Sequence, residues 1–176
     1  MNAPCEVKSV ILRVARELAR KPADVERAVV IFEDGYVTPE ITQHLRSRTL
    51  VPFRSQEHGL AVAIVHTHPL PRSAPSLADL WALCIMSTNR TPAYLATVYS
   101  SGEGSVVTIY IAKRRLHPQE IREIIRKSYL YELLNVRFRF APEISEKQIR
   151  EQHRILQEHG IVVERYVFRR YYGHRS

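Results

Sequence analysis

The sequence predicts an α/β protein whose mixed β-sheet is flanked by helices. Two patterns favour this class. Short apolar runs rich in β-branched residues, typical of buried strands, alternate with stretches whose apolar residues recur every three or four positions, as on one face of a helix. Gly, Pro, Asn and Ser residues separate these segments and mark turns. With 176 residues, the chain is long enough to bury a core without disulfide or metal staples.

Before its longest apolar run, the chain predicts one long helix followed by shorter elements. In order, these are a helix at residues 7–20, a strand at 28–32, its hairpin partner at 36–38, a short helix at 39–46 and a strand at 48–54. The dipeptide Asp34-Gly35 is a signal for the hairpin turn. Pro52 interrupts the last strand and indicates an edge or a bulge.

The longest apolar run, residues 59–65, predicts a buried strand that leads directly into His66. A loop follows, and then the pattern predicts a helix from Ser76 to about Ser87 and two paired strands at 93–99 and 106–111. Together with the earlier strands, these complete the expected sheet. His66 is therefore expected at the end of a buried strand.

The motif His66-Thr67-His68-Pro69, with Asp79 further on, has the residue types and spacing of a hydrolytic zinc site. Strand side chains alternate between two faces, so both imidazoles leave the strand on the same face. Pro69 ends the strand, and Ser76 begins a helix whose first turn brings Asp79 within reach of the same metal. Two imidazoles and one carboxylate suit Zn²⁺ and leave a fourth position for water.

Each half of this motif also has a purely structural interpretation. Ser76-x-x-Asp79 has the sequence of a capping box, and a His-x-His pair can be two surface residues at the end of a strand. The two halves occur together after a buried strand, and this co-occurrence favours the metal site.

The stretch from His66 to Pro69, followed by Pro75, Ser76 and Asp79, resembles the signature of the JAMM, or MPN+, zinc metallo-isopeptidases. The ligand spacing, the first proline and the serine all match. Proline before the serine resembles the compact prokaryotic and archaeal members of that family, and it also resembles the RadC family, whose signature has the same spacing. The resemblance covers about residues 7–112.

The resemblance implies an MPN-like sheet, a catalytic domain at residues 1–112 and a zinc metallopeptidase activity. It implies Zn²⁺ as the cofactor, held by His66, His68 and Asp79. Ser76 carries over as the hydroxyl that stabilises the tetrahedral oxyanion, a role that can coexist with capping the helix. The remaining residues, 113–176, match no family pattern and are expected to form a small basic α+β appendage.

Amide hydrolysis expels an amine that must be protonated, so the site also needs a carboxylate that takes a proton from water and passes it to nitrogen. In the family, this carboxylate is a glutamate just before a short apolar strand. Glu26 occupies that place before the strand at 28–32. Glu33, at the far end of the same strand, is the competing candidate, because the sequence does not fix the register here.

The substrate that the resemblance implies is a ubiquitin-like modifier joined to a lysine, whose extended tail adds as a strand at a sheet edge. Only Thr88 to Pro92 connect the helix of Asp79 to the next strand. This leaves no room for the long insertion with which eukaryotic deubiquitinases hold a proximal ubiquitin. We therefore do not expect strict linkage specificity.

Charge divides the chain near residue 112. Residues 1–112 carry 11 Lys and Arg against 10 Asp and Glu, whereas residues 113–176 carry 15 against 8. The basic part predicts a helix at 118–134, an alternating strand at 136–140, a capped helix at 145–159 and a strand at 161–168. Such asymmetry indicates an anionic partner, although a solvated basic surface has the same composition.

An acidic protein, either the modifier or its conjugate, is the partner we expect at this basic part. A RadC-like, nucleic-acid-associated metalloprotein is the alternative function, and a scaffold without turnover ranks last because every ligand is present. No apolar run has the length of a membrane span, and the N-terminus lacks a signal-peptide pattern. The two cysteines, Cys5 and Cys84, indicate a reducing compartment, so we expect a cytoplasmic protein.

Overall fold

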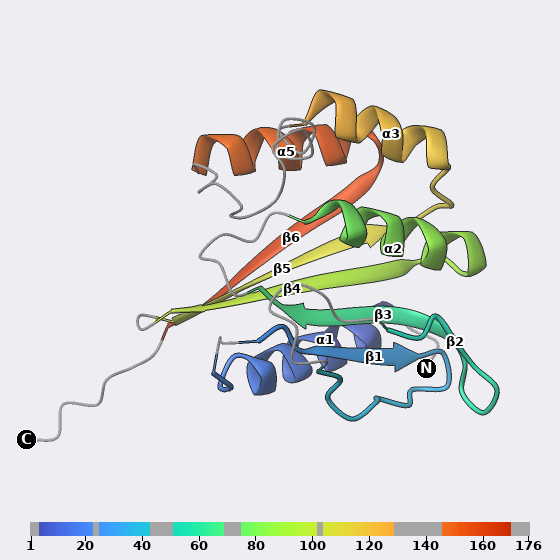
Figure 1. Cartoon of the computed structure of the whole chain (residues 1–176), viewed down its shortest axis with the longest axis vertical. Helices are drawn as coiled ribbons and strands as arrows, with labels where there is room; N and C mark the ends of the chain where they lie inside the picture. The colour runs from blue at the N-terminus through green and yellow to red at the C-terminus, as the bar shows by residue number, and fades with distance from the viewer. Residues whose placement is uncertain are drawn as a thin grey trace, which may run out of the picture.

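Figure 1 shows the computed structural model, which describes residues 4–22, 25–42, 51–68, 75–101, 104–128 and 146–169. These residues form a mixed sheet of six strands with helices against both of its faces. The predicted α/β class, with a mixed sheet flanked by helices, is therefore confirmed. The helices in the described part of the chain are too short or too polar to span a bilayer.

The strands follow the spatial order β1-β3-β4-β5-β6, and β2 pairs with β3 at its side. They are β1 (Ala28–Phe32), β2 (Arg54–Ser55), β3 (Gly59–Thr67), β4 (Ala93–Ser101), β5 (Gly104–Ala112) and β6 (Ile161–Arg169). The helices are α1 (Pro4–Leu18), α2 (Leu77–Asn89), α3 (Pro118–Lys127) and α5 (Glu146–Glu158). Strands β3 and β4 are parallel, and the other pairs are antiparallel.

Two apolar layers hold the helices to the sheet. On one face, α1 packs Ile11 and Val14 against the central strands. On the other face, α2, α3 and α5 enclose a second cluster that includes Leu83, Ile121 and Leu156. Full burial of each such side chain contributes about 1.5–3 kcal/mol. Since the strands alternate between these layers, a slip of one residue would reverse every side chain, and the register is fixed.

The segment after β1 differs from the predicted hairpin and short helix. The turn at Asp34-Gly35 is present, because the Gly35 N–H donates to the Phe32 carbonyl at 2.9 Å. Beyond it, Val37 and Ile41 make only isolated bridges to β1. Residues 39–42 are not helical, and Ile41 exchanges backbone hydrogen bonds with Ala28, which contradicts the start of the helix predicted at 39–46. Residues 43–46, the rest of that helix, lie outside the described residues.

Two further predicted elements are shorter than expected. Of the strand predicted at 48–54, residues 48–50 lie outside the described residues, and residues 51–53 are not in a strand, although the Phe53 carbonyl accepts the Ala61 N–H at 3.0 Å. Strand β2 begins at Arg54. In the helix predicted at 118–134, α3 ends at Lys127, because Ser128 is extended and its hydroxyl donates to the Ile125 carbonyl at 3.4 Å. Residues 129–134 lie outside the described residues. The strand predicted at 136–140 lies outside the described residues.

The sheet continues across the predicted boundary at residue 112. Strand β6 pairs with β5 along its whole length, from Arg169 opposite Gly104 to Ile161 opposite Ala112. Ile161 and the apolar face of α5 belong to the same buried cluster as α2. The described part of residues 113–176 thus shares one sheet and one core with residues 1–112, while the division of function between the two parts stays a prediction.

Candidate metal centre

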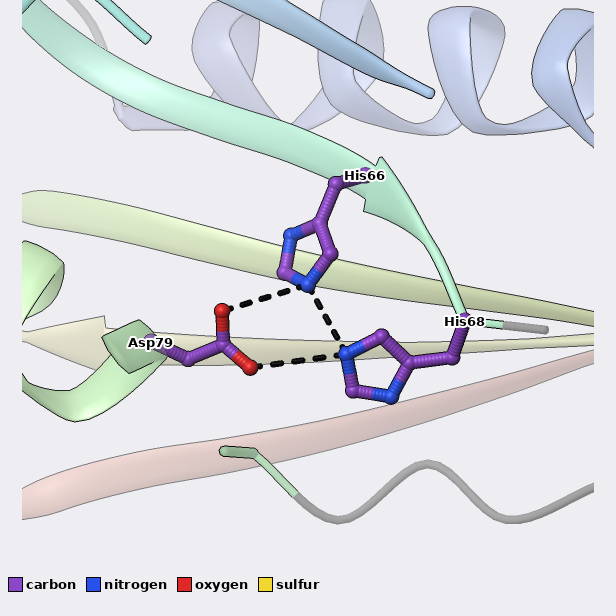
Figure 2. A group of neighbouring side chains, drawn as sticks. All are labelled: His66, His68 and Asp79. Carbon is purple, nitrogen blue, oxygen red and sulfur yellow. Dashed lines mark hydrogen bonds and ion pairs between the residues drawn. The ribbon is translucent and has the colours of Figure 1, made fainter. Parts of the chain in front are cut away.

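Strand β3 brings both predicted histidines to the face of the sheet that α2 covers (Figure 2). His66 lies inside the strand, is 3% exposed and pairs in register with Thr97 of β4. His68 follows the strand, and its backbone N–H donates to the Val98 carbonyl at 2.8 Å. Between them, the Thr67 hydroxyl accepts the Arg27 N–H at 2.9 Å. These bonds fix the end of β3 against both neighbouring segments.

Asp79 reaches the histidines from the first turn of α2. The Ser76 N–H donates to Asp79 Oδ2 at 2.7 Å, and the Asp79 N–H donates to Ser76 Oγ at 3.2 Å. The predicted capping box is therefore present, and it restrains the orientation of the carboxylate. The capping and metal-site interpretations of this sequence are compatible, because one carboxylate takes part in both arrangements.

The three side chains have the spacing of ligands around one ion. The Nε2 atoms of His66 and His68 lie 2.9 Å apart, and Asp79 places Oδ1 at 3.2 Å from the first and Oδ2 at 3.4 Å from the second. In a tetrahedral zinc site with bonds of about 2.0–2.1 Å, neighbouring ligand atoms lie about 3.3 Å apart. This group of buried and partly buried ligands could hold a metal ion.

The charges in this group also favour a cation. Burial alone would lower the pKa of His66. The charge of Asp79, its hydrogen bond to the imidazole and the charge of Glu26 outweigh burial and raise that pKa. Burial likewise disfavours a charged Asp79, yet the charge of His66 and hydrogen bonds to both histidines hold the pKa of Asp79 well below its usual value. A buried carboxylate needs a positive partner, and a divalent ion supplies one while leaving both imidazoles neutral.

The two candidate glutamates lie at opposite ends of β1. Glu26 precedes the end of β1 that pairs with His66. Burial raises the pKa of Glu26; the charges of both histidines lower it, and the charge of Asp79 raises it. Glu33 follows the other end, where it accepts the Leu60 N–H at 3.0 Å and lies 2.5 Å from the Arg90 guanidinium. The structure thus brings Glu26, and not Glu33, to the metal group.

Ser76 lies beside Asp79 with an exposed side chain. Its hydroxyl accepts one bond, from the Asp79 N–H, and a hydroxyl in this position still has a hydrogen to donate. Of the residues predicted for the site, His66, His68, Asp79, Glu26 and Ser76 are therefore all brought together. Their roles in catalysis stay predictions.

A polar row that sequence reasoning missed extends from His66 across the sheet. Thr97 is opposite His66, Thr108 is opposite Thr97, and both are fully buried. Next to them, burial and the charge of Asp79 raise the pKa of Tyr110, whose hydroxyl lies 3.4 Å from His153 Nε2 of α5. The available signal was a threonine within each of two otherwise apolar strands, but only the register shows that they meet.

Comparison of the chain with protein-family models finds no match, and comparison with curated proteins finds none either. The resemblance to the JAMM family is therefore carried by the motif around His66, and any function assigned to the site is a proposal.

Proposed function

We propose that this protein is a zinc-dependent metallopeptidase of the JAMM type, which hydrolyses the amide or isopeptide bond of a ubiquitin-like modifier conjugate. The observation that carries the proposal is the convergence of His66, His68 and Asp79 from a strand and a helix, with Glu26 beside them. The mixed sheet, with α1 on one face and α2 on the other, is compatible with the MPN-like fold that the motif implies.

The ligand set supports zinc over the hard cations of proteins. Mg²⁺ and Ca²⁺ take oxygen ligands, whereas His66 and His68 offer two nitrogens and Asp79 offers a single carboxylate. Bound zinc would polarise a substrate carbonyl and lower the pKa of water to about 7. Three protein ligands leave one position open, which a catalytic site requires and a structural site lacks.

Glu26 is suited to carry the proton. Burial raises its pKa above the usual 4.5, which is the direction that favours a general base. In the proposed reaction, water adds to the carbonyl carbon, its proton passes through Glu26 to the amide nitrogen, and the carbon–nitrogen bond breaks to give a carboxylate and an amine. Ser76 would donate its hydroxyl hydrogen to the oxyanion between these steps.

The experiment that tests this proposal uses the whole chain, a metal chelator and a ubiquitin-like protein fused through its C-terminus to a lysine side chain. We expect cleavage by the zinc-loaded protein, loss of cleavage after chelation and recovery when one equivalent of zinc is added. Cleavage that persists after the zinc is removed would contradict the proposal, and so would a chain that binds no zinc.

A further inference from the structure

Beyond the metal group, the ends of β4, β5 and β6 line a hollow of about 350 Å³. Its walls include Tyr99, Val106 and Val167, which lie opposite one another in register across the three strands. We call these three residues the apolar row. Neighbouring strands lie about 4.8 Å apart, so the row presents a continuous apolar strip about 10 Å long.

The apolar row begins beside the metal group. The backbone N–H of His68 donates to the carbonyl of Val98, the residue before Tyr99. Strand alternation puts Tyr99 on the same face as Thr97, which lies opposite His66. The row therefore lies one residue pair further along the same face of the sheet, towards the ends of β4 and β6 at Ser101 and Arg169; Figure 1 shows these strand ends side by side.

Val167 is unusually accessible for an apolar residue of this chain. It is 61% exposed, more than any other large apolar side chain among the described residues. The opposite face of β6 is covered, since the Arg16 guanidinium lies 4.6 Å from the centre of the Phe168 ring. The exposure therefore belongs to the metal-group side of the strand, where Val167 adjoins the partly buried Val106.

Two arginines frame the exposed end of the row. Arg165 and Arg169 lie two residues before and after Val167, so strand alternation puts all three side chains on one face. Arg169 is exposed and lines the hollow. Arg165 is half-exposed, and its guanidinium lies 3.7 Å from the Glu146 carboxylate. The hollow thus combines apolar walls with the exposed Arg169 at its rim, which suits an apolar side chain next to a carboxylate.

We propose that the apolar row binds the part of a peptide substrate that adjoins the cleaved bond, and selects an apolar side chain with an acidic neighbour. This inference rests on the proposed function. The path from His68 of the metal group along the row to Val167 crosses three strand spacings, about 14 Å, which an extended peptide covers with about four residues at about 3.3 Å each. The selected side chain is therefore the fourth from the cleaved bond.

The test measures binding without turnover. The peptides carry fluorescein and a reduced central bond that cannot be cleaved. At the fourth position from that bond they have leucine or serine, and the neighbouring residue is glutamate or lysine. Fluorescence anisotropy measures their binding to the zinc-loaded protein. We expect the leucine–glutamate peptide to bind at least fivefold more tightly than its serine counterpart. Val167→Thr keeps the β-branched shape, so the strand is preserved, and should reduce that preference to less than twofold. Arg169→Glu should reverse the preference for glutamate over lysine.

Matched controls lie away from the row. Ile85→Thr removes another exposed apolar side chain, 43% exposed on α2, and Arg13→Glu reverses a charge on α1, which covers the opposite face of the sheet. Both should bind like the unaltered protein. Absence of binding, absence of a leucine preference, or equal effects in the controls would overturn the inference.

Cleavable versions of the same peptides separate this inference from the proposed function. If zinc produces no hydrolysis but the leucine preference depends on Val167, the proposed function fails and the apolar row remains a peptide-binding site. If hydrolysis depends on zinc but Val167→Thr leaves the leucine preference unchanged, the apolar row is not the substrate site.

Discussion

At the scale of single residues, two imidazole nitrogens 2.9 Å apart and a shared carboxylate predict one zinc ion per chain. The double variant His66→Ala, His68→Ala removes two of the three ligands, so we expect its zinc content to fall close to zero and hydrolysis to disappear. Elemental analysis of the purified variant measures this. His153→Ala, a histidine in contact with Tyr110, is the matched control and should keep its zinc. Full zinc occupancy in the double variant would refute the ligand assignment.

The second prediction separates the two glutamates. Glu26→Gln removes the proton carrier but no ligand, so kcat should fall by about 10²- to 10⁴-fold while zinc content and folding stay unchanged. Glu33→Gln should keep kcat within about twofold, because Glu33 contacts Leu60 and Arg90 at the other end of β1. Steady-state kinetics on one fluorogenic substrate compares the two variants. An inactive Glu33→Gln beside a normal Glu26→Gln would reverse the assignment.

Glu33→Gln should instead show a pH-dependent loss of stability. This loss would show that the substitution removes the contacts of Glu33 even though kcat is nearly unchanged. The Leu60 N–H and then Arg90 lower the pKa of Glu33 from its usual 4.5. A lowered pKa means that the ionised form stabilises the fold above about pH 4.5, and that this contribution is lost as the pH falls through the lowered value. The carboxylate is a third exposed, so we expect about 0.5–1 kcal/mol at pH 7 and progressively less as the pH falls below the usual 4.5, measured by urea unfolding.

At the scale of elements, the N-terminus of α2 combines capping with the proposed chemistry of Ser76. Ser76→Ala removes the acceptor for the Asp79 N–H and should cost about 1 kcal/mol of stability, whereas Ser76→Gly should cost only a few tenths. Both variants lack the hydroxyl donor, so both should lose about 10²-fold in kcat. Thermal unfolding and kinetics on the two variants test this. If kcat instead follows stability, so that Ser76→Gly has nearly normal kcat, then Ser76 caps α2 and takes no part in catalysis.

Sequence patterns predicted the elements that carry the ligands because the chemistry there is local. The apolar run before His66 is long enough to define a buried strand, and Ser76-x-x-Asp79 defines a helix start. Failures occurred where a contact distant in sequence decides the outcome. Ile41 exchanges backbone hydrogen bonds with Ala28, so residues 39–42 are not helical. The choice between the two glutamates also depends on such a contact: the sequence put Glu26 in the family's place but left Glu33 open, and the register of Ala28 with His66 brings Glu26 to the histidines.

At the scale of the whole molecule, the continuous sheet predicts that residues 1–112 do not fold without residues 113–176. Removing residues 113–176 would expose the paired edge of β5 and one side of the core that includes Leu83, because β6, α3 and α5 would be lost. We expect truncation after Ala112 to give an aggregated or unfolded chain, measured by circular dichroism and size-exclusion chromatography. A folded, monomeric fragment that retains zinc would instead support an independent catalytic domain at residues 1–112.

The basic part of the chain is therefore better tested by charge reversal than by deletion. Helix α3 buries Ile121, Ile124 and Ile125, while Arg122 and Arg126 are exposed one turn apart on its outer side. If this side attracts an acidic protein conjugate, reversal of both charges should slow cleavage of the conjugate by about tenfold at low salt and leave a short peptide substrate unaffected. The difference should shrink as salt rises, since screening weakens exposed charges.

The matched control reverses Arg13 and Arg20, two exposed charges on and just after α1, and should leave both substrates unaffected. Equal slowing in the two double variants would mean that net charge, and not the outer side of α3, is responsible. A parallel titration with double-stranded DNA and with RNA distinguishes the partner. Binding that weakens steeply with salt and depends on Arg122 and Arg126 would favour the RadC-like alternative, because phosphate contacts release counterions in proportion to their number.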